Sequence, residues 1–159
     1  MGPNFCMLSY LENIESTKCK TYEHSHYKHI TNKGRTLVAH RKFRYFMITL
    51  RLQRLFISLK TVERMTWHQS HDVVDGVMVH PSIGEAWKLF SSKHPHFSAK
   101  SRNVRLGLCT DGFNLFGSFA APYSCWPVIL IVYNLPPGMC MRSKFMFLST
   151  TIPGSSSPG

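Results

Sequence analysis

Three strand-like stretches follow one another in the carboxy-terminal half of the chain. Residues 104–111 alternate apolar and other side chains, residues 128–133 form a β-branched run, and residues 145–152 form a third, shorter run. Alternation with a period of two is typical of a strand. The connections between the stretches carry glycine and proline turn signals and show no helical periodicity. Because strands joined without a crossover helix pair antiparallel, this pattern predicts a three-stranded antiparallel meander.

Two helical stretches precede these strands. Between residues 48 and 65 apolar side chains recur at helical spacing and arginines occupy the remaining surface, which predicts one amphipathic helix with a cationic face. Farther along, Ser82 and Glu85 form a capping-box pattern, so a second helix is expected to begin at Ser82 and to end near His94 and Pro95. Basic helices followed by antiparallel strands make the predicted fold class α+β.

The chain is strongly basic, with 19 Lys and Arg against 8 Asp and Glu and a net charge of +11. This excess favours a polyanionic partner, either nucleic acid or an acidic membrane surface, although a basic protein without such a partner has the same composition. Between residues 35 and 46 cations alternate with aromatic residues, which could stack on bases or pack in a core. The candidate DNA-binding residues are Arg35, Arg41, Lys42, Arg44, Arg51 and Arg54.

Asp111 is a carboxylate at the end of an apolar strand, beside the turn residue Gly112. This position suits a metal ligand, but an Asp-Gly pair is also an ordinary turn. A two-metal phosphoryl-transfer site needs two or three carboxylates. No Asp or Glu follows Asp111 in the sequence. Asp111 is therefore a candidate Mg²⁺ ligand that lacks partners within this chain.

The cysteine and hydropathy patterns argue against secretion and against a membrane span. There are five cysteines, an odd number, and no signal-peptide pattern precedes them, so free thiols and no secretion are expected. Cys109 is expected to be a buried thiol. The spacing of Cys19, His24, His26 and His29 fits no standard zinc site, so zinc is not expected. The apolar run at residues 126–133 is too short to span a bilayer.

Several ordered blocks resemble the transposases of plant CACTA-type (En/Spm-like) DNA transposons. The resemblance runs from about Cys19 to the end of the chain. Its blocks are Arg44-Tyr-Phe, Arg51-Leu-Gln-Arg-Leu-Phe56, Gly84-Glu-Ala-Trp-Lys88, Arg102-Asn-Val-Arg-Leu-Gly-Leu-Cys-Thr-Asp-Gly-Phe-Asn114, Tyr123-Ser-Cys-Trp-Pro-Val-Ile129, Tyr133-Asn-Leu-Pro-Pro137 and Ile152-Pro-Gly154.

The resemblance implies an RNase-H-like core that cuts and joins DNA with divalent metal ions such as Mg²⁺. Three antiparallel strands open that core, and the first strand carries the first catalytic Asp, which corresponds to Asp111. The expected organisation is a degenerate Cys/His segment at 1–34, a basic helical region at 35–101, a truncated RNase-H-like core at 102–153 and a disordered tail at 154–159. The resemblance also implies a nuclear location.

Four positions depart from the family pattern. Tyr22 stands where a second zinc-binding Cys is usual, and Met47, Leu50 and Leu115 stand where prolines are usual. We therefore expect a truncated, inactive relic of a transposase with residual non-specific DNA binding and no metal of its own. The alternatives are a non-enzymatic module that binds DNA or full-length transposase, and a gene fragment without function.

Overall fold

A computed structural model describes residues 7, 10–28, 38–74, 76–114 and 124–154. The chain divides into two compact units. The first unit contains Met1–Arg44, Gly112–Trp126 and Thr151–Gly159, and the second contains Tyr45–Asp111 and Pro127–Thr150. Arg35, His29 and Leu115, and the loop glycine Gly117, lie outside the described residues.

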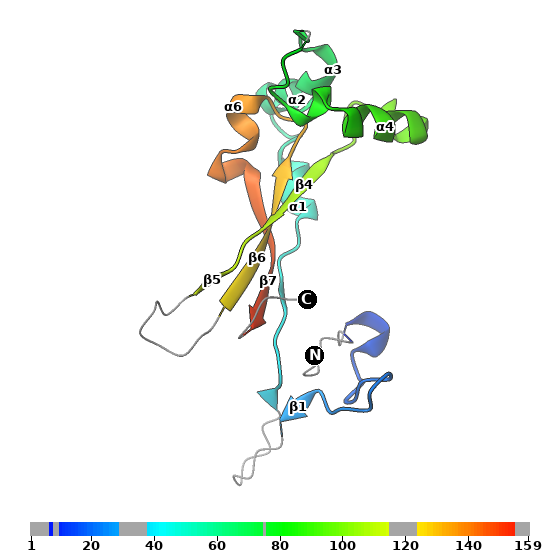
Figure 1. Cartoon of the computed structure of the whole chain (residues 1–159), viewed down its shortest axis with the longest axis vertical. Helices are drawn as coiled ribbons and strands as arrows, with labels where there is room; N and C mark the ends of the chain where they lie inside the picture. Colours follow the sequence, from blue (N-terminus) through cyan, green and yellow to red (C-terminus); the bar gives the residue numbers. More distant parts are fainter. Residues whose placement is uncertain (1–6, 8–9, 29–37, 75, 115–123, 155–159) are drawn as a thin grey trace. The chain divides into compact units, whose positions relative to one another are not determined.

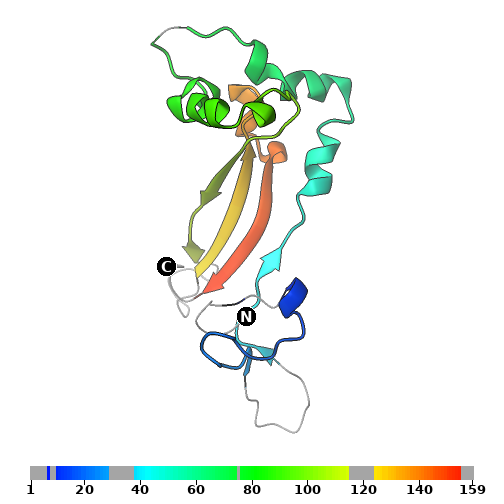
Figure 2. The ribbon, with the colours of Figure 1, turned by 90° about the vertical axis from the view of Figure 1, so that its right-hand side faces the viewer.

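The main sheet contains the three predicted strands in the predicted sequence order. They are β4 (Leu106–Thr110), β6 (Ser124–Val132) and β7 (Met146–Gly154). The strand order is β3-β7-β6-β4, with β3 at Arg44–Tyr45, and the short β5 (Phe113–Asn114) also pairs with β6. β4 and β6 pair antiparallel, from Leu106 opposite Val132 to Thr110 opposite Val128. β6 and β7 lie side by side and point in opposite directions (Figures 1 and 2). The α+β class and the meander are thus confirmed.

The predicted single helix at residues 48–65 is wrong: two short helices replace it, α1 (Thr49–Arg54) and α2 (Leu59–Met65). Residues 55–57 form a turn, and Ser58 takes an extended backbone with φ −94° and ψ 129°, which ends the helical path. The break has a packing reason, because both Leu55 and Met65 reach the core while Leu59 is 83% exposed. One continuous helix would have kept Leu59 on the same apolar stripe as Leu55.

The second predicted helix forms, but its start differs from the prediction. Ser82 lies in η2 (Pro81–Ile83), and Gly84 is the N-cap of α4 (Glu85–Lys93) without a side-chain cap. The Ser82 amide instead donates to Nδ1 of His80 at 3.2 Å, so the Ser82–Glu85 capping box is absent. The end of α4 is as predicted, since His94 leaves helical geometry and Pro95 begins α5 (Pro95–Ser98). α3 (Trp67–Ser70) connects α2 to this region.

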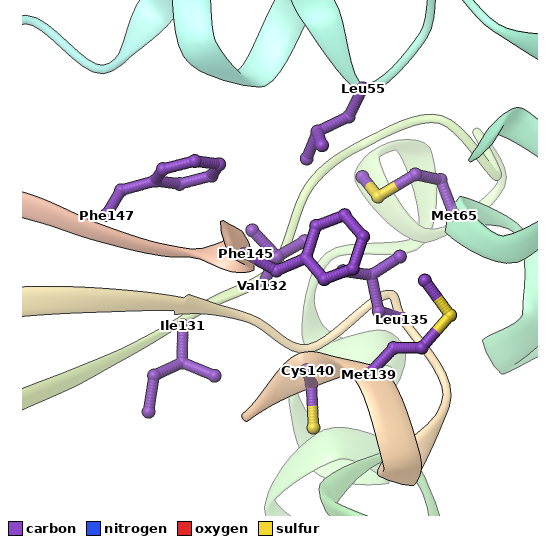
Figure 3. Close-up of a cluster of buried hydrophobic side chains, with 9 residues drawn as sticks. All are labelled: Leu55, Met65, Ile131, Val132, Leu135, Met139, Cys140, Phe145 and Phe147. Carbon is purple, nitrogen blue, oxygen red and sulfur yellow. The ribbon is translucent and has the colours of Figure 1, made fainter. Parts of the chain in front are cut away.

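The core of the second unit lies where β6 ends. α6 (Pro137–Cys140) and η3 (Ser143–Phe145) follow β6 and fold back over its last residues. Side chains from the turn after α1 and from α2, β6, α6, η3 and β7 meet there (Figure 3). The buried residues are Leu55, Met65, Ile131, Val132, Leu135, Met139, Cys140, Phe145 and Phe147. Burial of this apolar surface is the main favourable term for the fold of this unit.

The apolar face of β4 is not part of that core. Leu108 is 68% exposed and Cys109 is exposed, so the prediction of a buried Cys109 thiol is wrong. Gly107, which precedes them, is buried under the ring of Tyr133, and a Cβ at this position would overlap that ring. β4 lies at the edge of the described sheet, which explains why side chains on it remain accessible.

The first unit contains η1 (Leu11–Asn13) and a short antiparallel pair, β1 (Tyr27–Lys28) with β2 (Val38–Ala39). Cys19 and His26 are buried, and His24 is exposed. The Cys19 amide donates to the His24 carbonyl at 2.9 Å. Across the described residues of both units, no helix has the length and apolar character to cross a membrane.

Candidate catalytic carboxylate and nucleic-acid interface

Asp111 directly follows β4 and its side chain is exposed. β5 resumes the pairing with β6 in the same register, with Phe113 opposite Cys125, so Asp111 lies opposite Pro127. Because proline has no amide proton, it cannot donate to the strand that carries Asp111, and the ladder is interrupted there. The next residue, Gly112, lies against the Trp126 ring, where a Cβ would be 2.5 Å from the indole Cε2. The sequence therefore builds a strand end with an accessible carboxylate.

The predicted cations belong to both units of the chain. Arg41, Lys42 and Arg44 belong to the first unit, whereas Arg51 and Arg54 lie on α1 of the second unit. Arg51 donates to the Leu148 carbonyl at 3.4 Å, so this side chain is tied to β7. The side chains of Lys42, Arg44 and Arg54 are exposed. The aromatic residues between the cations divide as well, since Tyr45 is exposed and Phe43 and Phe46 are half-buried.

A second group of cations surrounds α5, and the sequence reasoning missed it. Lys93, Lys100 and Arg102 are exposed, as are His94 and His96. No Asp or Glu occurs between Glu85 and Asp111, so this part of the surface has no acidic counterpart along the chain. That long gap between carboxylates was the available signal. The cations themselves are too widely spaced in sequence to attract notice.

A cleft of about 370 Å³ lies between α4, α5 and the start of β4. The residues that line it are mostly aromatic and aliphatic, and Arg105 is the charged residue among them. The principal lining residues are Trp87, Phe90, Phe97, Arg105, Leu106 and Tyr133. A concave apolar site with one charged group is a common form of ligand site in proteins.

Arg105 holds two of the aromatic walls in place. Its guanidinium carbon lies 4.0 Å from the ring centre of Trp87 and 4.9 Å from that of Phe90. Its nitrogens donate to the Trp87 carbonyl at 3.2 Å and to the hydroxyls of Ser91 and Ser98, each at 2.9 Å. Burial lowers the pKa of Arg105, but an arginine starts so far above neutrality that it remains charged. Arg105 thus joins α4, α5 and the residues before β4.

Asn134 connects the same region to the end of β6. It is fully buried, its Oδ1 accepts from the Arg105 amide at 2.7 Å, and its Nδ2 donates to the Asn103 carbonyl at 3.0 Å. The Tyr133 amide donates to the Arg105 carbonyl at 3.0 Å, which extends the pairing of β4 and β6 by one bond. These bonds fix the backbones of Arg105 and Tyr133, two lining residues of the cleft, relative to each other.

Three histidines pack with two tryptophans behind α4. His71 stacks on Trp67 with ring centres 4.1 Å apart, His80 meets Trp67 edge-on at 5.1 Å, and His68 meets Trp87 at 5.5 Å. Burial lowers the pKa of His68 and of His80, and the nearby Arg105 and His71, respectively, lower them further. Both rings therefore favour the neutral form at pH 7, which suits a packed aromatic cluster.

Residues 75–159, more than half of the chain, match the family model described as transposase family tnp2. The chain belongs to this transposase family. The matched range includes Asp111, the cleft and the cations around α5, and it excludes the predicted cations between Arg35 and Arg54. No curated protein and no solved structure matches the chain.

Proposed function

We propose that this chain is a non-catalytic, DNA-binding relic of a CACTA-type (En/Spm-like) plant transposase that acts in the nucleus. The observation that carries the proposal is the family match at residues 75–159, because this range contains β4, Asp111 and the neighbouring strands. The finer CACTA assignment is supported by blocks outside the matched range, above all Arg51-Leu-Gln-Arg-Leu-Phe56. The division into segments ending at residues 34, 101 and 153 remains part of this proposal.

The sheet supports an RNase-H-like origin for residues 102–153. β4, β6 and β7 are neighbours in the sheet, and Asp111 follows the first of them. This arrangement agrees with the three antiparallel strands that the resemblance implies, with the first catalytic carboxylate on the first strand. In the proposal Asp111 is the descendant of that carboxylate.

A complete metal centre does not fit the residues present. Mg²⁺ takes oxygen ligands, and the exposed Asp111 carboxylate could supply one. Two-metal chemistry requires more carboxylates. Within the described parts of the chain, no three side chains of His, Cys, Asp or Glu are grouped so that they could hold a metal ion. We derive no catalytic step through a metal ion.

The proposed DNA binding rests on charge. With a net charge of +11, the chain is expected to attract phosphates wherever cations are exposed. Arg35, Arg41, Lys42, Arg44, Arg51 and Arg54 are the proposed contacts for duplex DNA. We propose binding without sequence preference, since α1, which carries Arg51 and Arg54, has only 6 residues.

The experiment is a paired assay of cleavage and binding on the purified chain. Supercoiled plasmid with Mg²⁺ or Mn²⁺ should remain uncut, while fluorescence anisotropy should detect weak binding to duplexes of unrelated sequence. Metal-dependent nicking that disappears in Asp111→Ala would refute the non-catalytic assignment. Binding to one duplex over its scrambled version would refute the absence of sequence preference.

A second candidate function is pairing with another transposase chain. The edge strand β4 favours it, because its five residues are uncharged and Leu108 is 68% exposed. An uncharged, exposed edge is a template for strand addition. Leu108→Lys should then abolish co-purification with a full-length transposase of the same family without changing DNA binding. Unchanged co-purification would exclude the β4 edge as the contact.

A further inference from the structure

The cleft beside α4 has walls suited to a flat aromatic group. Phe90 and Phe97 meet edge-on, with ring centres 5.5 Å apart, and the Arg105 guanidinium packs over the rings of Trp87 and Phe90. Phe90 is still 39% exposed, so part of its ring faces solvent rather than core. Tyr133 closes the side next to the sheet. Aromatic rings that are fixed but accessible provide stacking surface at low entropic cost.

Three exposed cations, Lys93, Lys100 and Arg102, lie close in sequence to residues that line this cleft. The ring of His94 lies 4.6 Å from that of Phe90, and Lys93 precedes it at the end of α4. On the other side, the Lys100 amide donates to the Phe97 carbonyl at 3.3 Å, and Asn103 Nδ2 donates to the same carbonyl at 2.8 Å. The loop that carries Lys100 and Arg102 is therefore fastened to α5, beside the aromatic wall.

Charge and shape together select the occupant. A peptide that fills an apolar cleft needs no neighbouring cations, and an acidic membrane surface offers no flat aromatic group. A DNA strand offers both phosphates and bases, but in a duplex the bases are stacked and paired and cannot enter a cleft. Only unpaired nucleotides present a phosphate chain to Lys93, Lys100 and Arg102 and a free base to Phe90 and Trp87.

The geometry points to a binding site for an unpaired nucleotide of DNA in the cleft between α4, α5 and the start of β4. The base stacks against Phe90 and Trp87, and the flanking phosphates lie along Lys93, Lys100 and Arg102. Arg105 is a positioning residue, because three of its N–H groups donate to Ser91, Ser98 and the Trp87 carbonyl and hold α4 and α5 together. β4 then carries the nucleotide site at its start and Asp111 at its end, roughly 20 Å apart at the usual rise per strand residue. This inference rests on the proposed DNA binding.

The test compares the affinity of the whole chain for a duplex and for the same duplex with a short gap of unpaired thymidines. The gapped DNA should bind about tenfold more tightly, given the usual contribution of base–aromatic stacking. Phe90→Ala should remove that preference and leave duplex affinity unchanged. Leu89→Ala is the matched control, because Leu89 is on the same helix, is 56% exposed and does not line the cleft. Circular dichroism confirms folding, and Phe90→Leu replaces Phe90→Ala if the latter unfolds.

A charge variant tests these cations separately. Lys100→Ala with Arg102→Ala should weaken gapped DNA more than duplex DNA. The control, Lys60→Ala with Lys144→Ala, removes the same charge at exposed positions elsewhere in the second unit and should weaken both DNAs equally.

The outcomes separate this inference from the proposed function. Duplex binding without a preference for gapped DNA overturns the nucleotide site alone, and so does a preference that survives both Phe90 variants. Absence of all DNA binding overturns the proposed function together with the site. A cleft that serves an apolar peptide instead would leave every DNA affinity unchanged in Phe90→Ala, which also overturns the site.

Discussion

Two cationic regions of this protein differ in how their charges are supported. Between residues 35 and 54 the cations are dense in the sequence, yet the described ones divide between two units, and Arg51 is bonded to the main chain of β7. Around α5 the cations are sparse in the sequence, yet they flank residues that line a cleft with aromatic walls. Charge density along a chain therefore indicates attraction to a polyanion, whereas a shaped site needs side chains that other elements hold in place.

The comparison makes the two regions separable by experiment. The first region should act through counterion release, which does not depend on the form of the DNA. The second should add discrimination between paired and unpaired strands.

Salt dependence should give the largest effect. If about six phosphates are bound, duplex affinity should fall on the order of a thousandfold between about 50 and 200 mM salt. Changing Arg41, Arg44, Arg51 and Arg54 together to Ala should flatten the log–log slope by about 0.9 for each phosphate that the variant no longer neutralises. Anisotropy titrations across a salt series measure both slopes. If the slope is the same in the quadruple variant as in the parent chain, duplex binding would have to be assigned to the cations around α5 instead.

Arg105→Ala should give the next largest effect, now on stability. The change removes three side-chain hydrogen bonds and two ring contacts. It should lower the free energy of unfolding by roughly 3 kcal/mol, since bonds to charged groups contribute about 1.5–3 kcal/mol. Arg105→Lys keeps the charge but not the planar fork, so it should recover only part of the loss. Urea unfolding measures both variants. A full recovery by Lys would show that charge alone matters at this position.

Acid should destabilise the α4 region by a smaller amount. The pKa of His68 and of His80 is lowered by burial from the ordinary value of 6.5, so the unfolded chain binds more protons than the folded chain as the pH falls below about that value. The contribution of these histidines to stability is then complete above the unfolded pKa and is lost as the pH drops toward the folded values. Thermal melts from pH 7.5 to pH 5 measure the loss, which His68→Gln should reduce.

The same pH series also distinguishes the two cationic regions. Since His68 contacts Trp87, acid should also weaken the preference for gapped DNA before it weakens duplex binding. A stability that is flat over this pH range would mean that the histidines are not buried in solution.

Asp111→Ala should give the smallest effect. Asp111 is exposed and follows the last residue of β4, so its removal should leave stability within about 0.5 kcal/mol of the parent chain. Removing a negative charge should slightly tighten duplex binding. Melting curves and anisotropy measure these values. A loss of several degrees would indicate that the carboxylate has a structural partner.

Local sequence patterns predicted the secondary structure correctly where no packing requirement opposed them. The β-branched run before Tyr133 and the proline after His94 both predicted their elements, since strand preference and proline sterics act over a few residues. The helix at residues 48–65 was predicted wrongly because its periodicity is compatible with one helix, while packing required a turn at Leu55. Burial of Leu55 and Met65 in one core outweighed the continuity of the helical pattern.

The sequence by itself determined the family, the antiparallel strands and the place of Asp111 at a strand end, because motifs and periodicity are local properties. It also determined the net charge, which depends on composition alone. Only the tertiary structure decided that Arg105 holds Trp87 and Phe90, that Tyr133 covers Gly107, and that the loop of Lys100 and Arg102 lies beside the cleft. These contacts join residues from separate elements, and their formation depends on which surfaces the core leaves exposed, which no local pattern records.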